Sequence, residues 1–267
     1  MNCAPGNKNK SLLSCYSREQ LRKMVKAIRK DNNQSNANLI KTLRKEFPDC
    51  IDETCFLEQE PIKNVIDKEM REYTFKPQMP NAWLKDRNTW LSTTDIQKVM
   101  KQYEREYTDF KYYGPFPIDC PVEINCEVTN LDLKKHLKQG KKRIGIGYNL
   151  DKHYQPGSHW VSLYIDIPNS TIIYYDSTSG EAPYILRQFI EFLLKQLEGL
   201  NNKARFDYNR KQHQFGGSEC GVYSMNFLVE MLKGKTLEDF QKKKVSDFSV
   251  NLLRDYFYRT NQKKVKY

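Results

Sequence analysis

The chain has 267 residues, of which 39% are hydrophobic and 29% are charged, and 44 basic against 33 acidic side chains give it a formal net charge of +11. This length suits one large domain, or a catalytic domain with an accessory one, and the hydrophobic fraction suffices for a folded core. The sequence contains no apolar run of about 18 residues that would span a membrane. The first residues also lack the apolar segment of a secretory signal, so we expect a protein that stays in the cytosol.

The seven cysteines are odd in number and contain no CxxC pair. This spacing argues against a disulfide framework and against a four-cysteine zinc site, so we expect neither a metal nor another cofactor. A reducing compartment would keep a catalytic thiol usable. Apart from Cys220, discussed below, the cysteines are interpreted as buried structural thiols: Cys3, Cys15, Cys50, Cys55, Cys120 and Cys126.

Lysines concentrate towards the C-terminus, at 242–244 and at 263, 264 and 266. A basic surface attracts nucleic acid or an acidic protein, so non-specific DNA or an acidic scaffold is a candidate partner. Charge runs alone specify no partner, and a solvated surface is the simpler interpretation. No zinc finger, RNA-recognition signature or phosphate loop predicts sequence-specific binding.

The first 80 residues predict a helical accessory region. Residues 1–16 are expected to be loosely attached, and Ser17 begins a capping box that opens a helix with an apolar stripe. A second helix is predicted over 37–47, followed by short helical pieces separated by prolines. The segment Pro77–Pro80 is interpreted as a linker, which gives an accessory region at 1–80 and a catalytic domain at 81–267.

From residue 81 the pattern alternates between helices and strands, with no internal repeat. A capping box at Thr94 opens one helix, and Asn130 is expected to cap another over 131–137. A hairpin turn is predicted at Pro168–Ser170. The other expected segments are strands over 112–118, 143–149, 159–167, 171–176 and 205–209, and helices over 183–200, 220–233 and 248–259. This order predicts an α+β domain in which helices pack on a small mixed sheet.

Cys220 follows a glycine-containing turn and begins an apolar helical run. A thiol is a weak nucleophile until it loses its proton, and both a nearby imidazole and a helix N-terminus favour the thiolate. Gly216, Gly217 and Gly221 allow tight backbone turns around it. An isolated cysteine of this kind would more simply be a buried structural residue, so the prediction depends on its companions.

Three residues complete the set typical of a thiol hydrolase. His159 opens a β-like run and is expected to serve Cys220 as general base and then the leaving amine as general acid. Asp176 ends a later strand and could hold the far nitrogen of that imidazole. Gln214 could donate its amide hydrogen to an oxyanion, together with the backbone N–H of Cys220. His213 competes with His159 because it lies closer to Cys220 in sequence. A surface histidine, a turn aspartate and a loop glutamine are the plainer interpretations of each residue alone.

His159-Trp160, Asp176 and Gln214-x5-Cys220-Gly221 resemble, in order and local context, the papain-like cysteine proteases that include the SUMO and NEDD8 proteases, the adenovirus protease and the core proteases of large DNA viruses. The resemblance covers about residues 83–260. It implies a papain-like core with a central mixed sheet flanked by helices. It also implies a Cys-His-Asp triad with a glutamine in the oxyanion hole.

Trp90-Leu91 and the helix after it are similar to the tryptophan motif that opens the SUMO-protease domain, although the spacing after Trp90 departs from that pattern. The resemblance implies that Trp90 and Trp160 enclose a narrow channel for a diglycine, with Gly221 on the same substrate-binding surface. Such a channel excludes any side chain before the scissile bond. Core packing is the alternative for both indoles.

Within the family, residues 175–180 and the helical N-terminal region are most similar to the proteases of large cytoplasmic DNA viruses such as African swine fever virus. This implies cleavage of structural polyproteins after Gly-Gly or Ala-Gly during virion maturation, in the virion and the host cytoplasm. Two alternatives stay open. One is an isopeptidase that deconjugates SUMO, NEDD8 or ubiquitin. The other is a basic nucleic-acid-binding virion protein with a vestigial thiol site.

Overall fold

The structure, a computed structural model, describes residues 2–7, 13–201, 203–242 and 245–260. It consists of two compact units, one formed by Met1–Met79 with Phe257–Tyr267 and the other by Pro80–Tyr256. The chain therefore returns to the N-terminal unit after completing the second unit. A single boundary near residue 80 does not anticipate this return.

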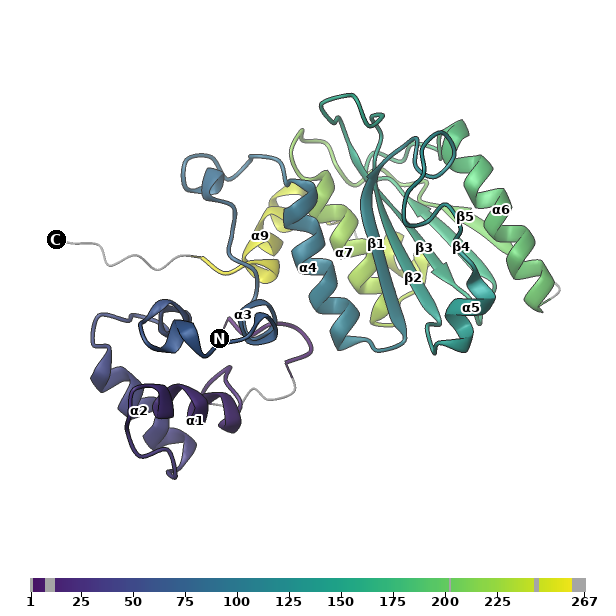
Figure 1. Cartoon of the computed structure of the whole chain (residues 1–267). Helices are drawn as coiled ribbons and strands as arrows, with labels where there is room; N and C mark the ends of the chain where they lie inside the picture. Colours follow the sequence, from purple (N-terminus) through teal and green to yellow (C-terminus); the bar gives the residue numbers. More distant parts are fainter. Residues whose placement is uncertain (1, 8–12, 202, 243–244, 261–267) are drawn as a thin grey trace. The chain divides into compact units, whose positions relative to one another are not determined.

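The N-terminal unit is helical (Figure 1). The predicted capping box begins its first helix, since the Ser17 hydroxyl accepts the Gln20 N–H at 3.1 Å and the Gln20 side chain accepts the Ser17 N–H at 2.8 Å. The apolar stripe of this helix packs with Leu39, Ile40 and Leu43 in one core. The elements are α1 Arg18–Ala27, α2 Asn36–Glu46, η1 Glu53–Glu58, η2 Ile62–Asn64 and α3 Lys68–Tyr73.

The expectation of a loosely attached N-terminus is wrong for the described part of residues 1–16, while residues 8–12 lie outside the described ranges. Ala4, Cys15 and Tyr16 are buried. The Ala4 N–H donates to the carbonyl of Thr74 at 3.1 Å. The segment is held because its few apolar side chains reach the same core as α1.

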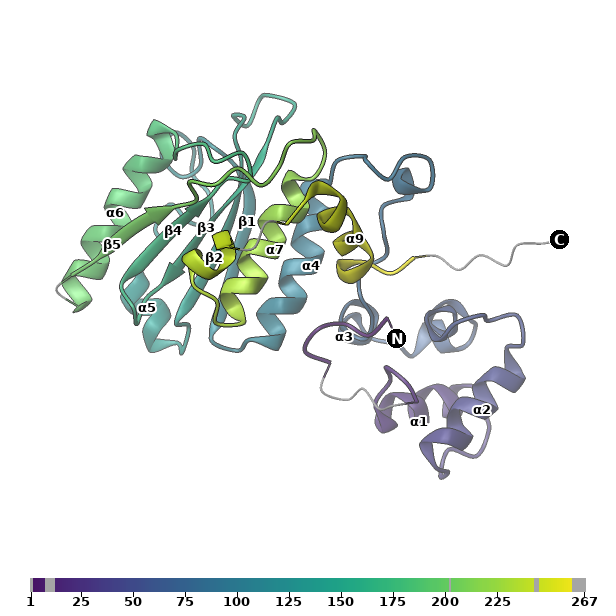
Figure 2. The same cartoon turned by 180° about the vertical axis from the view of Figure 1, so that it is seen from behind.

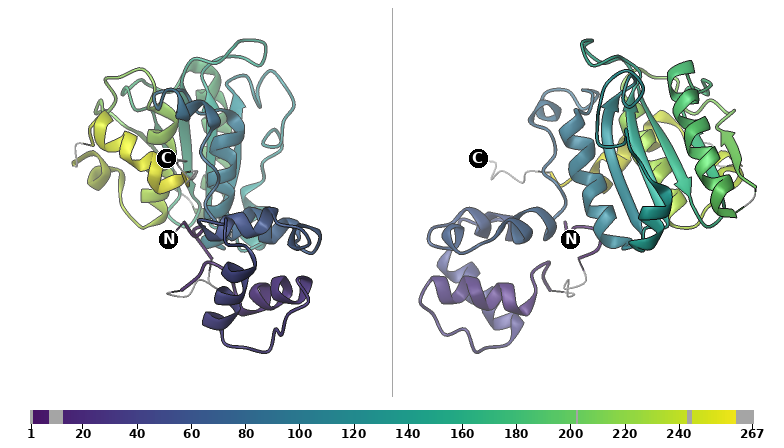
Figure 3. Two further views of the ribbon diagram at one scale, coloured as in Figure 1. Left: turned by 90° about the vertical axis from the view of Figure 1, so that its left-hand side faces the viewer. Right: turned by 45° about the vertical axis from the view of Figure 1, so that its right-hand side comes forward.

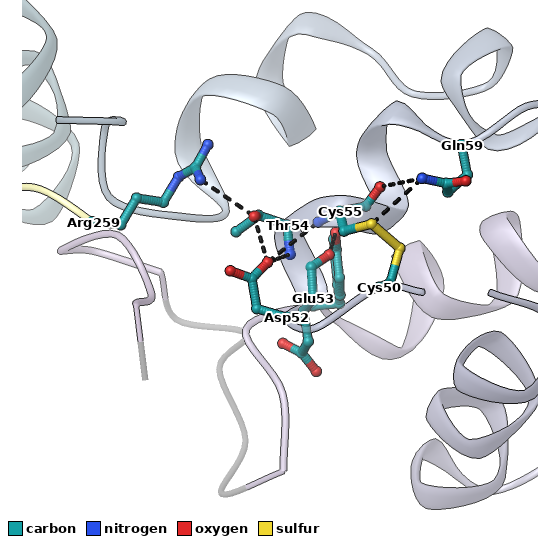
Figure 4. The surroundings of a disulfide bond; sticks show 8 residues. Cys50, Asp52, Glu53, Thr54, Cys55, Gln59 and Arg259 are labelled. Atoms are coloured by element: carbon teal, nitrogen blue, oxygen red, sulfur yellow. Dashed lines mark hydrogen bonds between the residues drawn. A yellow bond between two sulfur atoms is a disulfide. The ribbon is translucent and has the colours of Figure 1, made fainter. Parts of the chain in front are cut away.

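The interpretation of six cysteines as unpaired thiols is also wrong. Three disulfides join Cys3 to Cys15, Cys50 to Cys55 and Cys120 to Cys126, with Cα–Cα distances of 5.2, 5.3 and 6.0 Å. Cys220 stays free and buried. An odd count therefore means three short-range pairs and one thiol. Near the second pair (Figure 4), the Asp52 carboxylate caps η1, and the Arg259 guanidinium donates to the Thr54 hydroxyl at 3.2 Å.

The disulfides predict a labelling pattern. Protein purified and denatured without reductant should take up one iodoacetamide, at Cys220, because the six paired cysteines lack the thiolate that reacts. After reduction all seven cysteines should be labelled. Intact mass and peptide mapping measure both states. Labelling of three or more cysteines before reduction would contradict the pairing.

The second unit is built on a five-stranded mixed sheet with the order β1-β2-β3-β4-β5. The outer pairs β1–β2 and β4–β5 are parallel, and the inner pairs are antiparallel. The predicted turn at Pro168–Ser170 joins β3 to β4, and Ser170 adopts φ 47°. The predicted mixed sheet is therefore confirmed. Its strands are β1 Phe110–Pro117, β2 Arg143–Asn149, β3 Trp160–Asp166, β4 Thr171–Tyr175 and β5 Arg205–Tyr208.

Helices cover both faces of this sheet (Figures 1 and 2). On one face lie α4 Thr93–Glu106 and α7 Cys220–Leu232, and on the other α5 Leu133–Lys138 and α6 Tyr184–Asn201. The right-hand view of Figure 3 shows α4 and α6 on opposite sides of the strands. Strand β3 alternates accordingly: Leu163 packs in the core with α6, whereas the Ser162 hydroxyl donates to the Ser224 carbonyl of α7 at 3.3 Å.

A glycine in β2 lets α7 approach the sheet. A Cβ at Gly145 would lie 2.8 Å from Phe110 and 3.3 Å from Leu228 of α7. The approach matters because α7 is buried almost throughout its length. Among the described residues, no helix is both long and apolar enough to cross a bilayer.

Local signals differ from expectation at several helix ends. The box of α4 begins at Ser92, whose N–H donates to the Asp95 carboxylate at 2.9 Å, and not at Thr94. Asp132, not Asn130, caps α5. Helix α8, Leu237–Lys242, was not predicted, because six residues are too few to show a helical period. The remaining elements of this unit are η3 Asn81–Leu84 and α9 Asp247–Phe257.

Candidate active site

His159, Asp176 and Cys220 converge at one end of the sheet. His159 directly precedes β3, Asp176 directly follows β4 and Cys220 is the first residue of α7. Because β3 and β4 are antiparallel neighbours, the start of one lies beside the end of the other. Helix α7 packs across this pair, and Phe227 stacks on Tyr175 with ring centroids 4.5 Å apart. The packing brings the N-terminus of α7 to the two strand ends.

The His159 imidazole and the Asp176 carboxylate form a buried pair, with Nε2 2.7 Å from Oδ1. The exposed fraction of the His159 side chain is 17% and that of Asp176 is 5%. Thr178 donates both its N–H and its hydroxyl to Oδ1 at 2.8 Å. Burial raises the pKa of Asp176, but the bonds from His159 and Thr178 outweigh it and hold that pKa below its usual range. Asp176 is therefore an anionic acceptor.

The pKa of His159 is raised to about 9. Burial lowers it, but hydrogen bonds and electrostatic attraction from Asp176 and Cys220 outweigh burial. Because Nε2 faces the carboxylate, the other ring nitrogen is left for a different partner. Cys220, which is 1% exposed, also lies at a helix N-terminus, where unpaired N–H groups favour negative charge. The raised pKa of His159 suits an imidazolium beside the Asp176 carboxylate.

Gln214 lies buried beside the same strand end. Its Oε1 accepts the Ser177 hydroxyl at 2.7 Å, which orients the amide, and its Nε2 donates to the Gly216 carbonyl at 2.8 Å. An amide nitrogen carries two hydrogens, so one N–H remains for a further acceptor. Ser177 also anchors the backbone, because its carbonyl accepts the Gln214 N–H at 2.9 Å. The sequence prediction did not include Ser177, whose position directly after Asp176 was the available signal.

The two predicted tryptophans contact glycines that lie before and after Cys220 in the sequence. Trp160 is buried, its indole N–H donates to the Leu91 carbonyl at 3.0 Å, and a Cβ at Gly221 would lie 3.2 Å from its ring. Trp90 is 41% exposed and donates to the Gly217 carbonyl at 2.7 Å. Core packing is therefore the wrong interpretation for Trp90. Of the two tryptophans that precede α4, Trp83 is the buried one.

The competing histidine has another environment. His213 is buried in an aromatic cluster, with Nδ1 3.1 Å from the Tyr175 hydroxyl and its ring stacked on Tyr223. Burial and the charge of Lys211 lower its pKa, which keeps it neutral.

An acid–imidazole pair that the sequence did not reveal joins His153 to Asp119 at 2.6 Å, in the loop that leads to His159. Within the described ranges, no three His, Cys, Asp or Glu side chains gather as metal ligands.

Comparison with known proteins identifies the family. The model of the Ulp1 protease family, C-terminal catalytic domain, matches residues 149–265, which include all four predicted catalytic positions. R355 of Acanthamoeba polyphaga mimivirus, a thiol protease by name, is 30% identical over 99% of this chain and 95% of its own length. The chain belongs to the Ulp1 protease family. It is a viral cysteine protease acting on protein substrates, and the sequence resemblance is confirmed at this level.

Other Ulp1-family relatives agree. The cysteine protease S273R of African swine fever virus is 24% identical over 81% of this chain and 85% of its own, and in another isolate it is named SUMO-1 cysteine protease. The crystal structure of the African swine fever virus pS273R protease matches 98% of this chain and 96% of that chain, with a TM-score of 0.75 at 19% identity. The match confirms the predicted α+β fold with a helical N-terminal region.

A glycine that was not predicted leaves room for the Asp176 carboxylate of this Ulp1-family site. A Cβ at Gly180 would lie 2.6 Å from Oδ2 of Asp176. Gly180→Ala should therefore displace the carboxylate and lower kcat/KM about 10- to 100-fold, as misplacement by about 1 Å does. Gly199→Ala, where nothing lies within 4 Å, is the matched control and should leave peptide turnover unchanged. Equal kinetics for the two variants would contradict the prediction.

Proposed function

We propose that this enzyme is a cysteine endopeptidase that cleaves viral structural polyproteins after Gly-Gly or Ala-Gly during virion maturation, in the virion and the host cytoplasm. One observation carries the chemistry: the His159–Asp176 pair at 2.7 Å meets Cys220 at the N-terminus of α7. The relatives with names from large DNA viruses support the biological setting.

The proposed reaction has two halves, formation of a thioester on Cys220 and hydrolysis of that thioester. The Cys220 thiolate attacks the scissile carbonyl, and the oxyanion accepts hydrogen bonds from the Cys220 N–H and the remaining Gln214 N–H. The His159 imidazolium gives its proton to the leaving amine, which leaves a thioester. The neutral imidazole then takes a proton from water, the hydroxide attacks the thioester, and the Cys220 thiolate leaves, which restores the thiolate–imidazolium pair and releases the carboxylic acid product. Asp176 holds the ring orientation and stabilises its charged form.

Glycine specificity is proposed from the two indoles. Trp90 is bonded to Gly217, three residues before the nucleophile, and Trp160 lies against Gly221, one residue after it. Indoles on both sides of Cys220 would leave a narrow passage that admits a glycine backbone and excludes a Cβ. Trp90 presents an exposed surface for this role.

A second candidate is an isopeptidase that removes SUMO, NEDD8 or ubiquitin. The relative named SUMO-1 cysteine protease favours it, and its chemistry at Cys220 would be identical. A vestigial thiol site in a nucleic-acid-binding protein is the least supported, because His159 interacts with both Asp176 and Cys220. DNA or an acidic scaffold stays a proposed partner, although lysines 243, 244, 263, 264 and 266 lie outside the described residues.

Matched fluorogenic peptides ending in Gly-Gly, Ala-Gly and Ala-Ala, assayed beside SUMO, NEDD8 and ubiquitin C-terminal probes, test the proposal. A maturation endopeptidase would be supported if the enzyme cleaves the Gly-Gly and Ala-Gly peptides but not the Ala-Ala peptide, and if Cys220→Ala cleaves none of them. Turnover of a ubiquitin-like probe alone would transfer the assignment to an isopeptidase. Peptide turnover that survives in Cys220→Ala would exclude the thiol mechanism.

The partner proposal has its own test. DNA affinity is measured against salt for the full chain and for a variant whose six C-terminal lysines are glutamines. Counterion release predicts an affinity that falls steeply with salt and a shallower slope for the variant. Binding that is indifferent to salt and to the lysines would contradict a DNA-binding role.

A further inference from the structure

The segment between the two oxyanion groups, as described, contains no helix or strand. Residues 215–219, here called the oxyanion loop, connect Gln214 to Cys220, and Phe215 at its start is 68% exposed. The loop contains Gly216 and Gly217, which give it conformational freedom that must be removed before Gln214 can be placed. Within the loop the Glu219 carboxylate accepts the N–H and the hydroxyl of Ser218, and side chains outside the loop supply further fixation.

One face of α9 provides that fixation. Asp247, Asn251 and Arg254 have the i, i+4, i+7 spacing that places side chains in one row along a helix. Oδ2 of Asp247 accepts the N–H groups of Phe215 at 3.0 Å and Gly216 at 2.7 Å. Its Oδ1 lies 2.9 Å from the Tyr223 hydroxyl. One carboxylate thus ties the start of the loop to α7.

The rest of the row holds the end of the loop. The buried Arg254 guanidinium donates Nη2 to the Ser218 carbonyl at 2.9 Å and Nε to Asn251 at 2.8 Å. Asn251 in turn donates to the Glu219 carboxylate at 3.0 Å. Arg254 also donates to the carbonyl of Thr89, the neighbour of Trp90, at 3.1 Å. The row therefore bonds both ends of the oxyanion loop and the segment that carries the exposed indole.

We infer that the polar row of α9, led by Asp247, positions the oxyanion hole of this protease. The connection is direct: Asp247 holds the Gly216 N–H, and the Gly216 carbonyl receives the Gln214 amide. Without the carboxylate, Gly216 can rotate and Gln214 loses the acceptor that aims its amide. These are positioning residues, because none touches the reacting atoms. The inference rests on the oxyanion role proposed for Gln214.

The test compares Asp247→Ala with Asp247→Asn on the full chain. Loss of aimed oxyanion donors should lower kcat about 10- to 100-fold in Asp247→Ala while KM stays within about twofold, since the donors act in the transition state. Asp247→Asn should keep kcat within about threefold, because its amide oxygen can accept both N–H groups and its NH2 can donate to Tyr223. Asp239→Ala, which removes a first-turn aspartate from α8, is the matched control with unchanged kinetics.

A second readout separates positioning from damage to the fold. Iodoacetamide alkylates Cys220 without forming an oxyanion, so its rate should be equal in wild type and Asp247→Ala. The fold-loss of kcat caused by Asp247→Ala should also be smaller in a Gln214→Ala background, because both substitutions remove the same function. Full kcat in Asp247→Ala, or alkylation that falls in step with kcat, overturns the inference. Activity lost in Gln214→Ala but kept in Asp247→Ala leaves the proposed function intact. A wild type that alkylates but cleaves no substrate contradicts the proposed function and the inference together.

Discussion

Cys220→Ala is expected to lower kcat/KM for a Gly-Gly peptide by about 10⁴-fold or more, because the only free thiol of the described chain begins α7 beside His159. No other group in this arrangement can form the acyl-enzyme. The side chain loses one buried sulfur, so the midpoint of thermal unfolding should change by only a few degrees, as for removal of about 1 kcal/mol. Steady-state kinetics and a thermal melt on the same preparations measure the two effects.

Cys220→Ser is the matched control for size. Its hydroxyl keeps nearly the same volume and hydrogen-bonding capacity. However, the charged His159 beside Asp176 cannot keep a serine hydroxyl deprotonated at neutral pH. We expect it to be as inactive as the alanine variant and closer to wild type in stability. A serine or alanine variant that cleaves the Gly-Gly peptide with a kcat/KM within about tenfold of wild type would contradict Cys220 as nucleophile.

Asp176→Ala has the second largest expected effect, a fall of about 10²- to 10⁴-fold in kcat/KM at pH 8. The pKa of His159 is about 9 in the folded protein, so its charged form persists well above neutrality. Removing Asp176 leaves burial to act against the remaining attraction of Cys220, and the pKa must fall. The alkaline limb of the kcat/KM profile should therefore move from about pH 9 towards lower pH.

The same pair should appear in stability. Since the pKa of His159 is raised from 6.5, its contribution to the free energy of unfolding is complete below pH 6.5 and is lost as pH rises through about 9. Asp176 has a lowered pKa, so its contribution is present above 3.8 and is lost as pH falls below it. The stability difference between wild type and Asp176→Ala should thus be greatest near neutral pH. Two results together would contradict the ion pair: an alkaline limb at the same pH in wild type and Asp176→Ala, and a stability difference between them that does not change with pH.

Much of the catalytic unit could be predicted because its signals are local. Strand β2 was predicted with its observed bounds, and α7 with its observed start, since β2 alternates large apolar side chains with glycines and most of α7 is apolar. The order of His159, Asp176 and Cys220 led to the site hypothesis for the same reason, because each residue stands next to the end of a predicted strand or helix.

What could not be predicted depends on distant partners. Asp119 lies 34 residues before His153, and Asp247 lies 31 residues after Gly216, so no periodicity connects either pair. The disulfides were missed because the cysteines were counted together, although removing the nucleophile leaves an even number. The Ser177 contact with Gln214 likewise requires the β4 end and the oxyanion loop to be placed in space first.

The discontinuous N-terminal unit has a consequence for synthesis of the chain. Phe257 and Tyr258 are buried, and Arg259 exchanges backbone hydrogen bonds with Pro77 and Met79 at 2.9 and 3.0 Å. On the ribosome these residues emerge only after the whole catalytic unit has been made. The N-terminal unit is therefore completed after the catalytic unit, against the usual N-terminal-first order. Deleting residues 1–79 alone would also remove both backbone hydrogen-bond partners of Arg259, so a truncated protein should end at residue 256.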